Sequence, residues 1–255
     1  MRGNYVVRKG FQFGLSSKDR NLWKPESREA KAGMILAVLE SEFGKSRLKK
    51  MSCLDYGCST GIIANYLAPN FRKITGADID AKALAFAKKN SKRNAEFVLY
   101  NGKRLPFPDS SFDLVLCQQV YEHVPSHSAM VSEISRVLRP KGAAYFSGGN
   151  RLMLVEGHYN LPFLSWLPRS LANAYVRACG KGEQYYEKHL SYWGLKRLFR
   201  GFEIRDYTMR VFLEPEKFGS NSAAKRFSFL KILPRPLMEF LLPLSPTFVW
   251  VLVKK

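Results

Sequence analysis

The chain has 255 residues, of which 46% are hydrophobic, and it carries 41 lysine and arginine residues against 21 aspartate and glutamate residues. This composition excludes an intrinsically disordered chain, because the apolar content is sufficient for the buried core of one α/β domain. The formal net charge of +20 has two interpretations. It favours attraction to a polyanion such as RNA, an anionic membrane or a phosphate-bearing substrate, or it reflects only a basic solvated surface.

The cysteines and the apolar runs bear on the compartment. No two cysteines form a CxxC pair, and three of the four fall in or beside expected strands, which predicts buried free thiols in a reducing compartment. The first ten residues, MRGNYVVRKG, lack an apolar run of signal-peptide length. The apolar stretch 240–253 is interrupted by Pro243 and Pro246 and is too short to span a bilayer. We expect a cytoplasmic protein, and the basic charge leaves peripheral attachment to a membrane open.

The first 50 residues are expected to form a helical cap. Residues 1–25 are basic and aromatic and show no clear periodicity. Apolar residues then recur at helical spacing from residue 26 to residue 43, which predicts a helix there. A basic link at 45–50 leads into the next part of the chain.

Strand and helix patterns alternate from residue 51 to residue 150. Strands are predicted at 51–56, 73–78, 95–99, 112–117 and 143–147, and helices at 61–67, 81–90 and 128–138. Such alternation predicts a parallel sheet wrapped by helices. Residues 51–150 are therefore expected to form the core that binds the main ligand of the protein.

The regular pattern pauses twice after residue 150. Residues 151–190 and 208–245 are irregular and are predicted to be insertions in the domain. A helix and two further strands complete the pattern at 192–200, 202–207 and 247–253. Long insertions in a compact domain often form functional loops or lids. We therefore expect a single domain over residues 1–255 with two substrate lids.

A glycine-bearing turn joins the first core strand to its helix, in the run LDYGCSTG at residues 54–61. Glycine lets a ligand approach the backbone closely, and the amides of a helix N-terminus attract a carboxylate. S-adenosylmethionine has such a carboxylate on its methionine part, whereas dinucleotides usually require G-x-G-x-x-G, which this run is not. Asp78, at the end of the second strand, is placed to accept hydrogen bonds from both ribose hydroxyls of a nucleoside.

Four runs in order resemble the class I S-adenosylmethionine-dependent methyltransferases of the UbiE, or ubiquinone-biosynthesis, type. They are LDYGCSTG, ITGADID, RLPFPDSSFDLVLCQQVYEHV and SEISRVLRPKGAAYFSG, and together they cover about residues 51–150. The resemblance implies a Rossmann-like α/β fold with seven strands in the order 3-2-1-4-5-7-6. The last strand would be antiparallel, helices would flank the sheet, and lid insertions would follow strands 5 and 6. It also implies S-adenosyl-L-methionine as the cofactor.

The resemblance further implies which residues bind the cofactor: Asp55, Gly57, Cys58, Ser59, Gly61, Asp78, Ile79, Asn101, Gly102 and Gln118. It places residues 55–61 at the methionine part, residues 78–79 at the ribose and adenine, and residues 101–102 at the adenine edge. Gln118 would lie near the methionine part and the methyl group.

Three residues depart from the family pattern. Ser59 stands where the family usually has a glycine, so its Cβ can crowd the cofactor or its hydroxyl can add a hydrogen bond. Asn101 stands where an aspartate usually accepts the adenine amino proton, and the amide oxygen of Asn101 can still accept that bond. Lys141 replaces a glycine at a turn far from the chemistry. The first two departures concern the affinity for the cofactor and not its identity.

Methyl transfer needs a base only if the acceptor must lose a proton, because the cofactor supplies the reactive group. His123 is the candidate base, since imidazole titrates near neutral pH, and a turn cap is its alternative role. In the first insertion Glu156, His158 and Tyr159 are candidates for contact with the acceptor, with His158 as the second catalytic candidate. Some hydroxyl methyltransferases bind a divalent metal through E-x-x-E-H here. Gln119 replaces the first carboxylate, so we expect no metal.

The acceptor remains open at this stage. A small-molecule or lipid- or glycan-linked acceptor, an RNA, and a non-catalytic cofactor-binding module are the three hypotheses, and no RRM or KH signature supports the RNA. Phe163 and Trp166 are predicted to form a lid core or an apolar surface for the acceptor. The basic and aromatic region 217–240 is predicted to be a lid helix or a stretch that lies on an anionic membrane.

Overall fold

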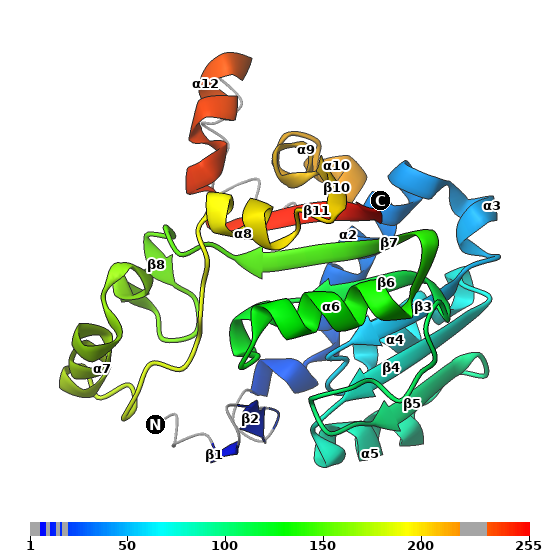
Figure 1. Cartoon of the computed structure of the whole chain (residues 1–255), viewed down its shortest axis with the longest axis horizontal. Helices are drawn as coiled ribbons and strands as arrows, with labels where there is room; N and C mark the ends of the chain where they lie inside the picture. Colours follow the sequence, from blue (N-terminus) through cyan, green and yellow to red (C-terminus); the bar gives the residue numbers. More distant parts are fainter. Residues whose placement is uncertain (1–5, 9–10, 14–15, 17–19, 220–233) are drawn as a thin grey trace.

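The computed structural model describes residues 6–8, 11–13, 16, 20–219 and 234–255 (Figure 1). Its centre is a seven-stranded sheet in the order β10-β11-β7-β6-β3-β4-β5. The strands are β3 (Ser52–Tyr56), β4 (Lys73–Asp78), β5 (Ala95–Leu99), β6 (Phe112–Gln118), β7 (Leu138–Gly149), β10 (Phe202–Asp206) and β11 (Thr247–Lys254). Numbered along the chain, the order is 3-2-1-4-5-7-6. β11 runs antiparallel to both of its neighbours, which confirms the predicted topology.

The five strands from β3 to β7 are parallel where they pair, so their carboxyl ends lie along one edge of the sheet. In the register, Asp55 of β3 lies opposite Gly76 of β4 and Leu116 of β6. Ligands of open parallel sheets bind at this edge, close to the point where the strand order reverses. β3 is that point, because β4 follows on one side of it and β6 on the other.

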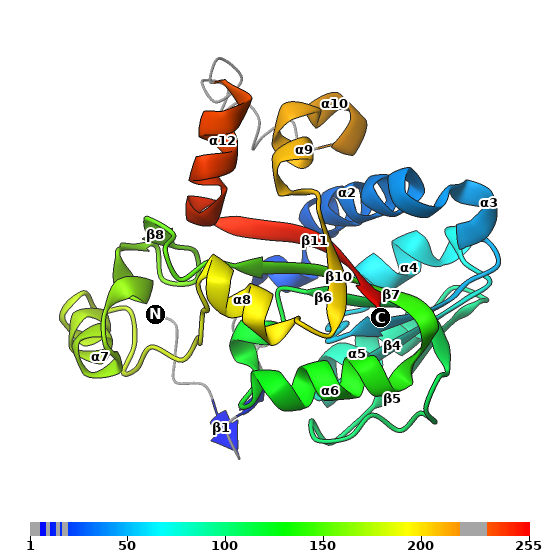
Figure 2. The same ribbon diagram turned by 45° about the horizontal axis from the view of Figure 1, so that its top comes forward.

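Helices cover both faces of the sheet (Figure 2). One face is covered by α2 (Pro25–Phe43), α4 (Ile62–Leu67) and α5 (Ala81–Lys89), and the other by α6 (His127–Val137) and α8 (Tyr192–Leu198). α2 begins with a proline at its first turn and ends at Phe43, with Gly44 as the residue that follows, which is the usual helix punctuation. The cap also contains β1 (Val6–Arg8), β2 (Phe11–Phe13), the short helix η1 (Arg20–Trp23) and α3 (Lys45–Leu48).

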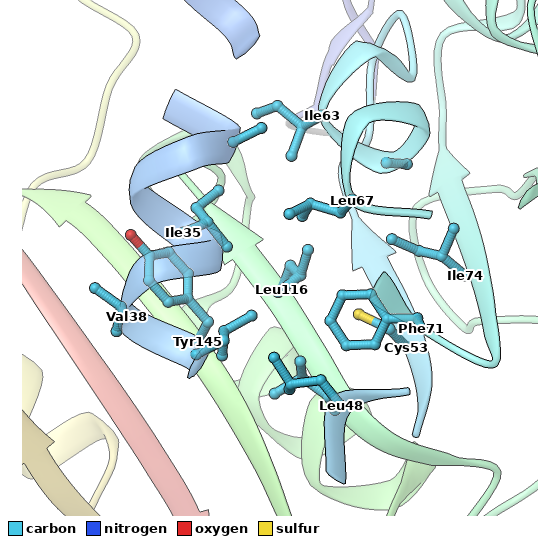
Figure 3. Packing of buried hydrophobic residues seen from close by; sticks show 14 of the residues in the cluster. Ile35, Val38, Leu48, Cys53, Ile63, Leu67, Phe71, Ile74, Leu116 and Tyr145 are labelled. Carbon is cyan, nitrogen blue, oxygen red and sulfur yellow. The ribbon is translucent and has the colours of Figure 1, made fainter. Parts of the chain in front are cut away.

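The strands bury both of their faces, because successive side chains point to opposite sides of the sheet. In β11, Val249 and Val251 join the core under α2, whereas Phe248, Trp250 and Leu252 join the core under α6. The first core is visible in Figure 3, where Ile35 of α2 and Leu67 of α4 approach one another over Leu116 of β6. The apolar run TFVWVLV is therefore a central strand of the sheet.

The first insertion has a small core of its own. It contains β8 (Val155–Glu156), β9 (Leu161–Pro162), the short helix η4 (Leu164–Trp166) and α7 (Arg169–Ala178). β8 and β9 form an antiparallel hairpin, and six buried residues pack around it: Tyr159, Leu161, Leu164, Ala172, Val176 and Tyr185. The insertion lies beyond the carboxyl end of β7 (Figures 1 and 2).

The second insertion is helical where it is described, with α9 (Thr208–Leu213), α10 (Pro215–Phe218), α12 (Arg235–Leu241) and the short helix η6 (Leu242–Leu244). The basic and aromatic stretch predicted at 217–240 falls mostly on residues 220–233, which lie outside the described residues. Two further short helices are η2 (Ala68–Asn70) and η3 (Tyr121–His123). Within the described ranges, no helix combines the length and apolarity needed to cross a membrane.

Candidate functional site

The turn after β3 depends on two glycines. Gly57 and Gly61 have φ angles of 77° and 69°, in the left-handed region that favours glycine. A Cβ on Gly57 would lie 2.6 Å from the side chain of Val120. A Cβ on Gly61 would lie 2.6 Å from Ala87 and from the ring of Phe97. Both glycines are therefore fixed by backbone conformation and by close packing, as the sequence motif predicts.

Ser59 occupies the same turn with a φ of 49°, so a non-glycine residue adopts the left-handed conformation here. This conformation costs about 1 kcal/mol. The Ser59 amide donates a hydrogen bond of 2.7 Å to Oδ2 of Asp78, and the Asp80 amide donates one of 2.8 Å to Oδ1. A hydrogen bond to a charged group contributes about 1.5–3 kcal/mol, which offsets the cost at Ser59. Asp78 thus holds the turn in shape, and its carboxylate can accept a further hydrogen bond from a ligand.

Two buried acceptors lie at the ends of the neighbouring strands β3 and β6. Oδ2 of Asp55 and Oε1 of Gln118 accept no hydrogen bond from any described residue. Burial raises the pKa of Asp55 to about 7, with the Arg28 charge opposing this rise and the Asp78 charge adding to it. Unsatisfied buried acceptors are costly and call for a donor. The ammonium of an amino-acid ligand is such a donor, so these two residues fit the methionine part of S-adenosylmethionine.

The other predicted cofactor residues have varied surroundings. The Cys58 thiol is buried in the core under α2, so the side chain of Cys58 is turned away from the turn. Asn101 uses its side-chain oxygen to accept from the amides of Lys103 and Arg104, at 2.9 and 3.3 Å. Gly102 is buried with a φ of 80°, and Ile79 is half-buried. The role of Asn101 and Gly102 at the adenine edge stays a prediction.

The N-terminal cap contacts the turn directly, which the sequence pattern did not show. The Thr60 hydroxyl donates a 2.7 Å hydrogen bond to the carbonyl of Leu22. The Ser16 hydroxyl donates one of 2.6 Å to Asp80, two residues after the strand-end carboxylate. Trp23 packs edge-on against Phe86 of α5, with ring centroids 5.1 Å apart. The cap therefore borders the turn and the strand end where the ribose is expected.

A second group of side chains gathers three of the four histidines of the chain with three glutamates. We call Glu122, His123, Glu156, His158, Glu187 and His189 the imidazole–carboxylate cluster. The two catalytic candidates meet here, because the rings of His123 and His158 stand perpendicular with centroids 5.0 Å apart. Glu187 and His189 were not predicted. A signal was present, since each histidine of the cluster follows a glutamate by one or two residues.

Three separate segments build the imidazole–carboxylate cluster. Glu122 and His123 lie on η3 after β6, Glu156 and His158 on and after β8, and Glu187 and His189 before α8. The Lys188 amide donates to the Glu122 carbonyl at 2.9 Å. The Tyr121 hydroxyl donates to the Gly149 carbonyl and accepts from the Leu190 amide at 3.1 Å. These bonds hold the segments together at the edge where β6 and β7 end.

Burial and charge divide the members of the cluster. Burial lowers the pKa of His158, but the hydrogen bond to Glu156 and the charges of the glutamates raise it more, to about 9. Burial lowers the pKa of His123 well below its usual range, and the nearby imidazoles add to this effect. Burial raises the pKa of Glu122 and of Glu187. His123 and His158 are also the two partly exposed members, at 13% and 24% of their side chains.

The remaining acceptor candidates divide between core and surface. Tyr159 is buried, donates to the Gln184 carbonyl at 3.0 Å and packs on Tyr185, so it belongs to the core of the insertion. The rings of Phe163 and Trp166 pack edge to face with centroids 5.2 Å apart, and the two residues are 50% and 42% exposed. They therefore form part of an apolar surface of the insertion.

Comparison with known proteins agrees with this geometry. Residues 54–146 match the family model described as a methyltransferase domain. The ubiquinone biosynthesis O-methyltransferase of Sodalis glossinidius is 31% identical over 102 residues, which cover 38% of this chain and 41% of that protein. The fatty-acid O-methyltransferase of Mycolicibacterium smegmatis is 37% identical over 124 residues, which cover 48% of this chain and 42% of that protein. The matches thus span less than half the length of these two relatives.

Solved structures share the fold over more of the chain. The plantazolicin methyltransferase BpumL, crystallised with a desmethyl plantazolicin analogue and SAH, has a TM-score of 0.60 at 18% identity and covers 94% of this chain and 89% of its own. An S-adenosylmethionine-dependent methyltransferase from Mesorhizobium loti has a TM-score of 0.58 at 16% identity and covers 89% of this chain and 100% of its own. Residues 54–146 are therefore similar to a methyltransferase domain, and the chain as a whole shares the fold of these solved structures.

Proposed function

We propose that the chain is an S-adenosylmethionine-dependent methyltransferase that methylates a hydroxyl group of a lipid-linked acceptor. The bound cofactor supplies a methyl group activated by its sulfonium. Asp55 and Gln118 would hold the methionine part, Asp78 would hold the ribose, and the turn 57–61 would let the cofactor approach the backbone. These residues lie at the strand ends where the fold binds its ligand.

The acceptor proposal rests on one observation: the first insertion, which contains the β8–β9 hairpin, carries both polar residues of the cluster and exposed apolar residues. Its Glu156 and His158 belong to the imidazole–carboxylate cluster. Apolar residues on the same insertion are exposed: Leu154 (64%), Val155 (49%), Phe163 (50%), Trp166 (42%) and Leu171 (56%). The hydroxyl of a lipid-linked acceptor could thus contact the polar residues while its apolar chain contacts the exposed apolar residues of the same insertion. The net charge of +20 favours an acceptor at an anionic membrane surface.

His123 is the proposed proton acceptor for the hydroxyl. It is partly exposed and lies on η3, five residues after Gln118 at the end of β6. Nδ1 of His158 lies 2.7 Å from Oε1 of Glu156, and the ring of His158 stands perpendicular to the ring of His123. Burial lowers the pKa of His123 well below its usual range, so the ring is neutral at pH 7 and able to accept a proton. A positioned base that takes a proton in the transition state contributes about 10²–10⁴-fold in rate. We therefore expect His123→Ala to lower methyl transfer by that order while leaving the binding of S-adenosylhomocysteine unchanged.

The proposal is tested by transfer of labelled methyl from the cofactor into a fractionated cell extract. Label in the lipid-extractable fraction is the expected result, and an unlabelled lipid fraction beside labelled RNA or labelled water-soluble small molecules would overturn the lipid-linked acceptor. Asp78→Ala serves as the matched control, because label that persists in this variant comes from another enzyme.

A further inference from the structure

One oxygen of the Glu156 carboxylate is bound by backbone amides, and the other faces two histidine side chains. Its Oε2 accepts hydrogen bonds from the backbone amides of His158 and Tyr159, at 2.8 and 2.9 Å. Its Oε1 lies 2.7 Å from Nδ1 of His158 and 3.3 Å from Nε2 of His189. Three potential ligand atoms from two distant segments thus converge on one point, and the backbone fixes the carboxylate between them.

These three atoms have the chemistry and spacing of metal ligands. Two imidazole nitrogens and one carboxylate oxygen form a donor set that suits zinc and other divalent transition metals. Ligands at about 2.0–2.2 Å from such an ion lie roughly 3–3.5 Å from one another. The three ligand atoms of Glu156, His158 and His189 all lie within 4.8 Å of one another, so small side-chain movements would complete the site.

A second observation points to a cation at the same place. Glu122 and Glu187 are 0% and 1% exposed, and none of their four carboxylate oxygens accepts a hydrogen bond from a described residue. Oε1 of Glu187 lies 3.9 Å from Nδ1 of His123, which is too far for a hydrogen bond. Burial without a partner disfavours the ionised form of a carboxyl group, and a neighbouring metal ion stabilises that form. A divalent ion beside His158 would compensate both carboxylates.

We propose that Glu156, His158 and His189 bind a divalent transition-metal ion, with Glu122 and Glu187 balancing its charge. This differs from the expectation of no metal, which rested on Gln119. The ligands proposed here come from the first insertion and the segment before α8. Three protein ligands leave coordination positions open, which is typical of catalytic metal sites. If the proposed function holds, the acceptor hydroxyl would bind at an open position of the metal, which would lower the pKa of that hydroxyl.

Metal binding is tested without cofactor or acceptor. Tag-free protein is stripped with a chelator, dialysed against micromolar Zn²⁺ or Mn²⁺, and analysed for bound metal per chain. We expect one ion per chain, and roughly tenfold or more weaker binding in Glu156→Gln and in His189→Ala. His127→Ala is the matched control. His127 packs at a tilted angle against Tyr121 and is outside the ligand set, so this variant should bind metal as the wild type does. Circular dichroism establishes that each variant is folded.

Two results would overturn the proposal. One is folded wild-type protein that binds no metal under these conditions, in which case a proton shared by Glu156 and His158 fills the site. The other is loss of metal in His123→Ala with retention in His189→Ala, which would assign the ligands to the neighbouring group of Glu122, His123 and His158. Metal binding without methyl transfer to lipid would keep the metal site and reject the acceptor instead, so the two failures are distinguishable.

Discussion

At the residue scale, Gly61 shows how backbone conformation and packing together select an amino acid. Its φ of 69° is unfavourable for any residue with a side chain, and a Cβ would lie 2.6 Å from Ala87 and Phe97. We expect Gly61→Ala to lower the free energy of unfolding by roughly 1–3 kcal/mol. Denaturant titration measures this change. Gly157→Ala is the control, because a Cβ there meets nothing within 4 Å, and an equal loss in both variants would contradict the explanation.

Asp55 gives a prediction about pH. Burial raises its pKa to about 7, so the carboxyl is mostly protonated at pH 6 and mostly ionised at pH 8. Only the ionised form attracts the ammonium of the cofactor. The affinity for S-adenosylhomocysteine should therefore rise between pH 6 and pH 8, which calorimetry at several pH values measures.

Asp55→Asn is the matched variant for this test, because it keeps the shape of the side chain and cannot titrate. We expect its affinity to be weaker at pH 8 and nearly independent of pH. A wild-type affinity that stays flat or falls across this range would contradict the assigned role of Asp55.

At the element scale, β11 explains an apolar run near residue 250 that resembles a membrane segment in composition. Trp250 is fully buried, packs on Phe146 and Phe199, and donates from Nε1 to Asp206 at 2.8 Å. Trp250→Ala should cost about 3–5 kcal/mol of the free energy of unfolding. Trp193 is 59% exposed and provides the control, since Trp193→Ala should change stability by less than about 1 kcal/mol. Similar losses in the two variants would argue against β11 as a central strand.

The hairpin and helix of the first insertion make a prediction about lipid surfaces. Phe163 and Trp166 are exposed neighbours on η4 and at its start. The double variant Phe163→Ser, Trp166→Ser should reduce co-flotation of the protein with anionic phospholipid vesicles several-fold, because the exposed rings are the largest apolar groups of this surface. Trp193→Ser, on α8, is the control. Unchanged flotation of the double variant would contradict the prediction that Phe163 and Trp166 contact the membrane.

The same scale shows what the sequence could predict. The core strands were predicted to within a residue or two of their ends. Apolar residues recur along each strand, continuously in β11 and at alternate positions in β10, and turn residues lie beside the strands. β7 is the exception: it begins at Leu138, five residues before the predicted strand, and ends at Gly149. The predicted helix at 128–138 was shifted by one residue. These elements are set by local periodicity and by turn residues.

The imidazole–carboxylate cluster could be predicted only in part. His123 and His158 were chosen for their chemistry, but nothing in local periodicity indicates that residues 122, 156 and 187 meet. Their contact depends on tertiary hydrogen bonds such as Lys188 to Glu122 and Leu190 to Tyr121. Ser59 is another case, since its tolerance of a left-handed turn depends on Asp78 nineteen residues away. Long-range bonds of this kind leave no periodic pattern in a single sequence.

At the scale of the whole molecule, the two candidate sites share one edge of the sheet. The turn 57–61 follows β3, Asp78 ends β4, and the imidazole–carboxylate cluster lies beyond the ends of β6 and β7. The cap borders the first site, and the first insertion builds part of the second. The proposed methyl transfer rests on this arrangement, with the cofactor expected at the first site and the acceptor at the second.

The most direct test of this account is calorimetric binding of S-adenosylmethionine to the purified chain. We expect a dissociation constant in the micromolar range for the wild type. Asp78→Ala should abolish binding, because it removes the strand-end carboxylate that is proposed to bind the ribose. The same carboxylate accepts the hydrogen bonds of the Ser59 and Asp80 amides. Asp109→Ala, a change at an exposed aspartate, should bind as the wild type does. Absence of detectable binding by the folded wild-type chain would contradict the central claim.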